Sequence, residues 1–413
     1  MGAGFKQVLG VIAAVAIILA LIVFVNPPGG GGVTPVKSGE VTLPQLTASI
    51  NKFTVDVLRK VGAEEGGSNF VMSPMNLYVA LLMLYEGTDS ETAQELANAL
   101  HIPPGSSVCN AYVELIGKLP VGSEGSAKLF IANGVWLRED FPFRKSYVSE
   151  VQKCFNATVK QFGSVEGLSD EINSWVSKKT EGMIKKLVGQ LSKDTEAVLA
   201  SAMYFKALWT DEFRYAGNMT FHTSSGDVKT HFMRVTSEFK VIKNSSYVAV
   251  ELPYRNTSIA MVIVMPNDIR SFTDNLTYEG LTNLLKNLRD AKPEKVEILM
   301  PAFYVKSRYD NMVKTLKELG VKSVFSDNAD FSKMAEVRRG TLTVSQVIHV
   351  AAINVTEKGT EASAATAITV VLTSVPPGSM PPLIKIDRPF MYFLVDTATG
   401  TVLFAGEVTN PAT

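Results

Sequence analysis

Residues 357–373 read EKGTEASAATAITVVLT, and this stretch constrains the possible folds of the chain more than any other. Its first half consists mainly of small residues and its second half of β-branched residues, with no proline. Every residue can therefore donate a backbone hydrogen bond to a neighbouring strand. Read as a strand, it has one face that is small and then aliphatic, and one that is more polar. It is longer than most strands, which usually have about 5–6 residues.

The same stretch is also suited to lie outside a sheet and to enter it later. Gly359 tolerates backbone angles that other residues do not, which makes it the candidate hinge. Small side chains at Thr360, Ala362 and Ala364 can pass between neighbouring strands, whereas a charged side chain there would be buried unpaired at a cost of several kcal/mol. An edge strand and a solvated alanine-rich loop are the simpler interpretations, and the pattern alone leaves them open.

Composition limits the classes of partner. The chain has 413 residues, a formal net charge of zero and 46% hydrophobic residues, enough for one large core or two ordinary ones. No basic excess is present to neutralise phosphates, so no nucleic-acid partner is expected.

The N-terminus has a separate character. Val8–Val25 is apolar apart from Gly10, and NPPGGGG follows it. A helix of this length spans about 27 Å, close to a bilayer core. The sequence therefore predicts a signal-anchor helix over residues 1–25, a flexible linker over 26–42 and a body over 43–413 that is anchored outside the cell membrane. A cleaved signal peptide and a secreted body remain the alternative.

Within the body, helical patterns dominate the first half and strand patterns the second, without steady alternation. This indicates an α+β domain with large mixed sheets and no internal linker. Ser73 suits the N-cap of a helix that starts at Pro74, and Thr88 and Glu91 have the spacing of a capping box. Residues 196–209 read as a long buried strand.

A search for catalytic signatures finds none. The four histidines stand outside any HExxH motif, and neither a GxSxG elbow nor a phosphate-binding loop is present. No metal or cofactor is predicted, and the chain is not expected to be an enzyme. A membrane-tethered hydrolase with an unmarked triad stays open, because such triads assemble in space. The two cysteines, Cys109 and Cys154, form either a disulfide or two unpaired buried thiols.

The stretch HVAAINVTEKGTEASAAT, which contains His349, resembles the hinge of the serpin family. NFVMSPMNLYVAL, MYFKALW and DRPFMYFLVDTATGTVLFAGEVTNP resemble other serpin segments in family order. Together the matches run from about residue 45 to 411. The resemblance implies a monomeric, inhibitory serpin with three β-sheets, about nine helices and an exposed reactive-centre loop. The apolar N-terminal run adds the expected membrane tether, and a prokaryotic source is expected. A non-inhibitory serpin that acts as a carrier, chaperone or surface protein is the alternative.

In the family, the loop is bait for a serine or cysteine protease, which cleaves it and is held as a covalent acyl complex while the loop enters the main sheet. Family spacing then places the cut between Thr373 and Ser374, with residues 359–373 inserting. A cut after Thr373 favours subtilisin-like or elastase-like targets, and a cut after Leu372 favours chymotrypsin-like ones. Residues Val370, Val371 and Leu372 would fill the protease subsites. The implied hinge consists of Glu357, Gly359, Thr360, Glu361, Ala362, Ser363, Ala364 and Ala365.

The resemblance also implies positions that control the opening of the sheet. Ser73 and His349 match hydrogen-bonding positions beneath the point where the strands part. Trp209 matches an aromatic residue where insertion begins. Ser201 stands where the family frequently has asparagine, so the usual hydrogen-bond network is not assumed.

Overall fold

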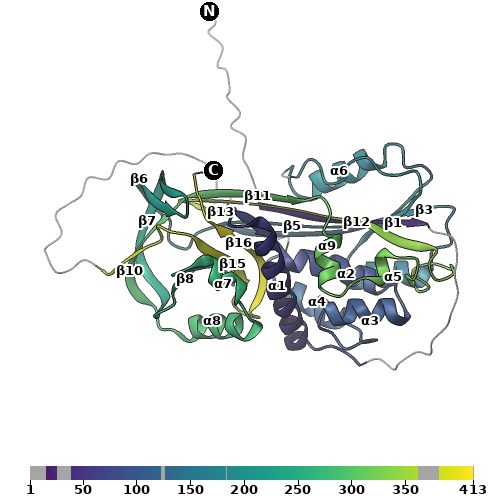
Figure 1. The fold of residues 1–413 in the computed structure, drawn as a ribbon, viewed down its shortest axis with the longest axis horizontal. Coiled ribbons are helices and arrows are strands. Elements are labelled where there is room, and N and C mark those ends of the chain that lie inside the picture. The colour runs from purple at the N-terminus through teal and green to yellow at the C-terminus, as the bar shows by residue number, and fades with distance from the viewer. Residues whose placement is uncertain (1–14, 26–38, 122–125, 183, 361–380, 413) are drawn as a thin grey trace, which may run out of the picture.

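The computed structural model describes residues 15–25, 39–121, 126–182, 184–360 and 381–412, which form two sets of hydrogen-bonded strands with helices packed around them (Figure 1). The helices of this part of the chain are α1 (Leu43–Glu65), α2 (Pro74–Tyr85), α3 (Ser90–Ala99), α4 (Cys109–Lys118), α5 (Lys145–Phe155), α6 (Leu168–Lys179), α7 (Ile269–Asp274), α8 (Tyr278–Asp290), α9 (Val313–Glu318) and the 3₁₀ turn η1 (Ser323–Phe325). The strands are β1 (Val15–Val25), β2 (Phe70–Met72), β3 (Ala127–Arg138), β4 (Thr158–Phe162), β5 (Thr195–Leu208), β6 (Arg214–Thr223), β7 (Gly226–Lys243), β8 (Tyr247–Pro253), β9 (Ile259–Pro266), β10 (Glu294–Pro301), β11 (Phe303–Tyr309), β12 (Leu342–Thr356), β13 (Gly359–Thr360), β14 (Leu383–Lys385), β15 (Phe390–Asp396) and β16 (Thr401–Val408).

The main sheet has seven strands, and its central members are the long strands β5 and β12. β3 and β4 extend it beyond β5, and β11 extends it beyond β12. Between β5 and β12 lie β13 at one end and β1 along the rest. The predicted long buried strand over 196–209 is confirmed by β5, which is buried along almost its whole length.

The second set has nine strands, and β7 divides it into two parts. One end of β7 pairs with β6 and β10, and the other end pairs with β8. The C-terminal hairpin β15–β16 lies beyond β8 and β9, with β2 at its edge. The α+β prediction with three sheets and nine helices is confirmed in the described residues, with two of the sheets joined through β7.

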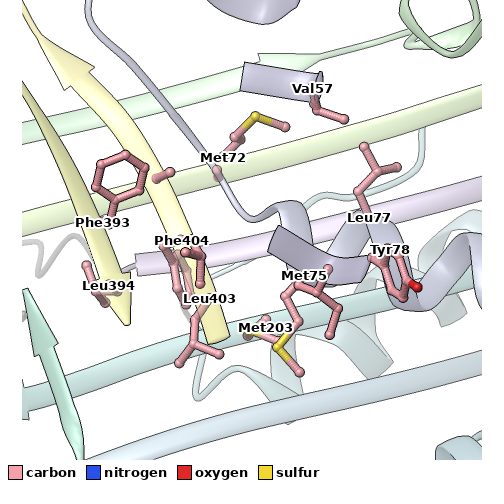
Figure 2. Packing of buried hydrophobic residues seen from close by; sticks show 14 of the residues in the cluster. Val57, Met72, Met75, Leu77, Tyr78, Met203, Phe393, Leu394, Leu403 and Phe404 are labelled. Carbon is pink, nitrogen blue, oxygen red and sulfur yellow. The ribbon is translucent and has the colours of Figure 1, made fainter. Parts of the chain in front are cut away.

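Helices cover both faces of the main sheet. In Figure 1, α6 lies over one face, and α2, α3, α4 and α5 lie on the other. On the α2 side, Met203 of β5 lies close to Met75 of α2 and to Leu403 of the C-terminal hairpin (Figure 2). On the α6 side, Trp136 and Trp175 meet edge to face with ring centroids 5.0 Å apart. The sheet is therefore buried on both faces, which explains why its strands are apolar rather than alternating.

Two predicted helix starts have different outcomes. α2 begins at Pro74, and the Ser73 hydroxyl accepts a hydrogen bond from the Asn76 N–H, as the sequence predicts. The predicted capping box of Thr88 and Glu91 is wrong, because the N-cap of α3 is Asp89. The Thr88 hydroxyl instead donates to the carbonyl oxygen of Tyr85, in the preceding turn.

The anchor prediction for residues 1–25 is wrong, because Val15–Val25 forms β1 inside the main sheet. In the described part of the chain, no helix is both long and apolar enough to cross a membrane. The predicted placement of the body at the outside of a cell membrane loses its basis with the anchor. An apolar run rich in valine and isoleucine suits a buried central strand as well as a helix, and periodicity does not distinguish the two.

The folded body begins before the predicted boundary at residue 43. Glu40 bridges to Ser107, and Val41 is buried. The rest of the predicted linker, residues 26–38, lies outside the described residues. A disulfide joins Cys109 at the start of α4 to Cys154 near the end of α5, so it links two helices on the same side of the sheet.

Candidate functional site

The candidate site is the region of the main sheet between β5 and β12, which we call the slot. It begins at the end where β13 lies. Thr360 of β13 lies opposite Val355 of β12 and opposite Ala207 of β5. β13 runs antiparallel to both neighbours and follows β12 in the chain after a two-residue turn at 357–358. The hinge segment thus enters the sheet as the start of a central strand.

Trp209, at the end of β5, fixes the turn before β13. Its indole Nε1–H donates to the carbonyl oxygen of Thr356 at 2.9 Å, and its backbone N–H donates to that of Lys358 at 2.9 Å. Its ring stacks on Tyr254, with centroids 4.4 Å apart and an interplanar angle of 10°. Trp209 is almost fully buried, so it is a rigid base for the entry point.

Thr360 itself is fully buried, and its hydroxyl lies 2.5 Å from the Tyr254 hydroxyl. Burial raises the pKa of Tyr254, so its hydroxyl stays protonated and available as a donor. Gly359 is the other constrained position, because a Cβ there would lie 2.0 Å from the carbonyl oxygen of Ala207. The close approach of β13 to β5 therefore requires glycine.

Glu357 connects the turn to the second set of strands. Its carboxylate lies 2.5 Å from Nε2 of His231 in β7, and its carbonyl oxygen accepts from the backbone N–H of Phe213 at 2.8 Å. Glu357 and His231 are both partly exposed. The turn is therefore tied to β5, β7 and the segment after β5 before the chain leaves the described region.

Beneath the middle of the sheet, Ser73 and His349 form a buried polar contact. The Ser73 backbone N–H donates to Nε2 of His349 at 3.2 Å, while the Ser73 hydroxyl donates to the carbonyl oxygen of Leu403 at 2.6 Å. Burial lowers the pKa of His349 to about 3, so the ring is neutral. No described residue gives its Nδ1 a hydrogen-bond partner. Since the imidazole meets a backbone N–H, it is not placed as a base for the Ser73 hydroxyl.

Ser201 lies at the centre of a second buried network. Its hydroxyl lies 2.6 Å from Oδ1 of Asn76 in α2 and 2.7 Å from Oδ1 of Asn133 in β3. The Asn76 amide in turn donates to the carbonyl oxygen of Ser201 at 3.0 Å. The short side chain of Ser201 thus connects β5 to an asparagine on each side. Sequence reasoning missed both asparagines, because their pairing depends on tertiary contacts.

Strand β1 passes directly between these two networks. Leu19 lies opposite Ser201 of β5 and opposite His349 of β12. Its neighbours continue the pairing in both directions, so the region between β5 and β12 is occupied along most of its length. Sequence reasoning missed β1 entirely. Its signal is the apolar run itself, which was assigned to a helix.

The remaining predicted site residues lie outside the described residues. These are the later hinge residues Glu361, Ala362, Ser363, Ala364 and Ala365, the subsite residues Val370, Val371 and Leu372, and the reactive bond Thr373–Ser374. Of the predicted set, the structure brings together Glu357, Gly359, Thr360 and Trp209 at one end of the slot. Ser73, Ser201 and His349 lie at its middle.

A search for metal ligands in the described residues finds one group of three, Cys109, Glu150 and Cys154. The two thiols are joined as a disulfide and are not available as thiolate ligands. Tyr254 was also missed by sequence reasoning, although it contacts both Trp209 and Thr360.

Comparison with known proteins gives concordant results. The family profile described as Serpin (serine protease inhibitor) matches residues 48–411. A serpin-like protein of Thermococcus kodakarensis is 33% identical over 373 residues, which cover 88% of this chain and 85% of the relative. A protein named serine protease inhibitor from Cyanea capillata is 32% identical over 85% of this chain and 94% of its own. These relatives come from a prokaryote and an animal, so prokaryotic origin stays a prediction.

Among solved structures, the native state of tengpin, a thermophilic serpin, superposes with a TM-score of 0.74. The alignment covers 91% of this chain and 97% of tengpin at 24% sequence identity, so it supports the fold alone.

Proposed function

Because the chain belongs to the serpin family of serine protease inhibitors, we propose that it is an inhibitor of the suicide type, acting as a monomer. Its partner is a serine protease that cleaves the loop after Thr373 and is then held as a covalent acyl complex. The chain supplies no catalytic group. The driving force is the free energy of extending β13 into the main sheet.

The chemical step belongs to the protease. Its serine oxygen bonds to the carbonyl carbon of Thr373, and the Thr373–Ser374 peptide bond breaks with release of the Ser374 amine. The chain is then attached to the protease through an ester. Insertion of residues 359–373 moves the attached protease along the sheet. The movement distorts the active site of the protease before water can cleave the ester.

The cut after Thr373 is part of the proposal. Val370, Val371 and Leu372 would bind the protease subsites, and this β-branched, uncharged sequence favours subtilisin-like or elastase-like targets. A cut after Leu372 would favour chymotrypsin-like targets instead. Mass spectrometry of the fragment released by the protease distinguishes the two bonds by one residue.

One observation carries the proposal: the hinge already forms a strand between β5 and β12. Thr360 is paired in register with both neighbouring strands. Between Thr360 and Pro376 the sequence contains no proline, and its one charged residue is Glu361. Extension of β13 would therefore continue a ladder that has already begun, into positions that β1 occupies in this structure.

The test is to mix the chain with subtilisin or elastase and to separate the products on a denaturing gel. The proposal expects a band at the summed mass of the chain and the protease that survives boiling. Cleavage of the chain without such a band, for every serine protease that cuts the loop, would contradict it.

A second candidate is a non-inhibitory serpin. The occupation of the slot by β1 favours it, because a sheet that is already complete gains little from a further strand. In that case, cutting the loop leaves the melting temperature unchanged and releases an active protease.

A further inference from the structure

β1 fills the part of the β5–β12 slot that β13 leaves open. It pairs with β5 over Val15–Phe24 and with β12 over Ile18–Val25, antiparallel in both cases. Both backbone edges of β1 are therefore hydrogen-bonded along most of its length, as in a central strand. Figure 1 shows β1, in purple, among the long strands of the main sheet.

β1 and β13 follow one register along β5. Thr360 lies opposite Ala207, and Val15 lies opposite Phe205. A regular strand that continued beyond Thr360 would place Ala362 opposite Phe205, because each residue advances the pairing by one position. Val15 therefore occupies the position that the register of β13 assigns to Ala362.

The pairing with β12 gives the same alignment independently. Thr360 lies opposite Val355, so a continued strand would place Ala365 opposite Val350. That position is occupied by Ile18. Two separate ladders thus assign the same site to β1 and to the segment that follows the hinge.

The alignment holds at the far end, after a register shift near Val23. Phe24 lies opposite Thr195 of β5 and opposite Thr343 of β12. Both registers assign this position to Leu372. β1 and residues 362–372 therefore cannot occupy the slot at the same time.

The two segments have the same general chemistry and different bulk. Neither 15–25 nor 362–372 contains a charged residue or a proline. The first is almost entirely valine, isoleucine, leucine and phenylalanine, whereas the second starts with alanine, serine and threonine. Larger apolar residues gain more from leaving water, so the composition of the N-terminal segment favours it as the occupant while the loop is intact.

We propose that the slot between β5 and β12 is a binding site for the chain's own N-terminal segment, Val15–Val25, and that this segment has to leave before the loop can insert. The loop would enter beside Val15, because β13 ends there, and would displace β1 from that end. Occupancy by β1 stands without the proposed function, whereas the displacement step rests on it.

A disulfide trap tests the occupancy. Ala20 lies opposite Ala200, and both are replaced by cysteine in the full chain (Ala20→Cys with Ala200→Cys). The native Cys109 and Cys154 are already joined, so the new pair supplies the only free thiols. The proposal expects mild oxidation to link the two new cysteines within one chain, detected as a cross-linked peptide by mass spectrometry.

The control pair is Ala20→Cys with Ala197→Cys. Ala197 lies on β5 three positions from Ala200, opposite Val23 and on the other face of the strand. This pair is expected to link at least tenfold less. Equal linking of both pairs, no link in either, or a link between two chains would overturn the assignment.

The trapped protein then tests displacement. The oxidised Ala20–Ala200 pair is expected to be cut by the protease without forming the covalent complex, and reduction is expected to restore the wild-type yield. Wild-type chain treated with the same reductant controls for loss of Cys109–Cys154. Equal complex formation by the oxidised and reduced forms would overturn the displacement step. If the wild-type chain forms no complex with any protease, the proposed function fails while the cross-link still decides the occupancy.

A second variant keeps the test independent of the new cysteines. Leu19→Pro removes a ladder donor in the middle of β1, and Val33→Pro is the control outside β1. The first is expected to lower the melting temperature by several degrees and to accelerate complex formation relative to the second. Identical behaviour of the two variants would count against β1 as an occupant of the slot.

Discussion

Val15 of β1 and Thr360 of β13 lie opposite residues of β5 that are only two positions apart, Phe205 and Ala207. The slot of this protein is therefore filled before any protease acts. The free energy that drives insertion of the loop is then the difference between two states, one with β1 in the slot and one with the loop segment in the slot. We expect the gain in melting temperature on loop cleavage to be smaller than for a sheet whose slot is vacant.

Under the proposed function, Thr360→Arg is expected to give cleaved chain in place of the covalent complex. Thr360 is fully buried against Tyr254, and an arginine there would bury an unpaired charge at a cost of several kcal/mol. The ratio of covalent complex to cleaved chain on a denaturing gel should fall at least tenfold. Thr360→Ser keeps the hydroxyl and should stay close to wild type. An unchanged ratio in the arginine variant would rule out the register of insertion.

Ser201→Ala is expected to lower the free energy of unfolding by about 1–3 kcal/mol. The single hydroxyl hydrogen of Ser201 is shared between the amide oxygens of Asn76 and Asn133, and its loss leaves a buried oxygen without a donor. Urea unfolding measures the change. Ser224→Ala, in an exposed turn, is the matched control and should change stability by less than about 0.5 kcal/mol. Equal effects of the two variants would show that the network contributes nothing.

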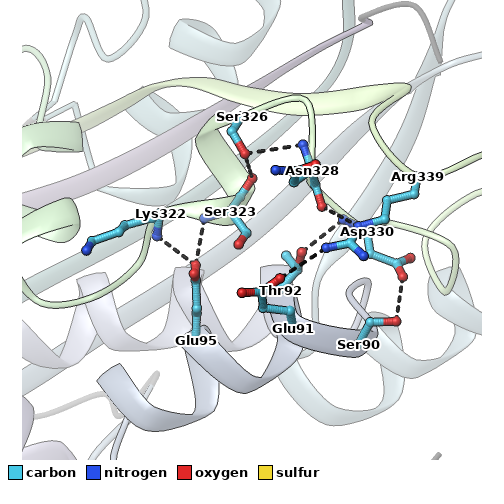
Figure 3. A network of polar contacts seen from close by, with 10 residues as sticks. All are labelled: Ser90, Glu91, Thr92, Glu95, Lys322, Ser323, Ser326, Asn328, Asp330 and Arg339. Carbon is cyan, nitrogen blue, oxygen red and sulfur yellow. Dashed lines mark hydrogen bonds and ion pairs between the residues drawn. The ribbon is translucent and has the colours of Figure 1, made fainter. Parts of the chain in front are cut away.

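Glu95→Ala tests the contact between α3 and η1 (Figure 3). The Glu95 carboxylate accepts from the backbone N–H groups of Lys322 at 2.8 Å and Ser323 at 2.6 Å, at the start of η1. Charge-assisted bonds of this kind contribute about 1.5–3 kcal/mol each, before exposure reduces them. We expect a loss of about 1–3 kcal/mol in urea unfolding.

The control for that variant is Glu91→Ala on the same helix. Glu91 is largely exposed and pairs with Arg339, at 3.2 Å. Surface pairs of this kind contribute about 0–1 kcal/mol. A loss in the Glu91 variant as large as in the Glu95 variant would mean that α3 stability, and not the contact with η1, is being measured.

Glu407→Gln is expected to have a pH-dependent effect on stability. Burial raises the pKa of Glu407 to about 7, although the hydroxyl of Thr273 donates to its carboxylate. The folded state therefore favours the protonated form. The stability that this form contributes is full below about pH 4.5, the ordinary pKa of the group, and is lost as pH rises through about 7.

Glutamine imitates the protonated carboxyl at every pH. The melting temperature of the variant minus that of wild type should therefore rise by a few degrees between pH 5 and pH 8. Glu238→Gln, at an exposed position of β7, should show no such trend. A difference that stays constant with pH would contradict the buried, protonated state of Glu407.

Local sequence signals predicted the elements whose causes are local. Ser73 and Pro74 mark the start of α2 because a cap needs only neighbouring residues. The roles of Trp209 and Gly359 in insertion came from the resemblance of the hinge to a known family and stay a prediction, while the structure places both residues at the turn into β13. Thr88 was misassigned because the adjacent Asp89 competes for the same cap, and spacing alone does not decide between them.

β1 could not be predicted in this way. Its residue Leu19 pairs with His349 and Ser201, roughly 330 and 180 residues away in sequence. The apolar run contains no local signal that identifies these partners. The buried asparagines Asn76 and Asn133 have the same character, since their partners come from other elements. Strand pairing between distant segments is fixed by tertiary packing and not by the local pattern.

The most direct test of the account is hydrogen exchange measured by mass spectrometry on the wild-type chain, before and after the loop is cut by a protease. The account predicts protected amides in residues 15–25 of the intact chain. After the cut, protection should move to residues 362–372, and residues 15–25 should exchange rapidly. A cut chain in which residues 15–25 stay protected and residues 362–372 exchange freely would contradict the claim that one segment replaces the other.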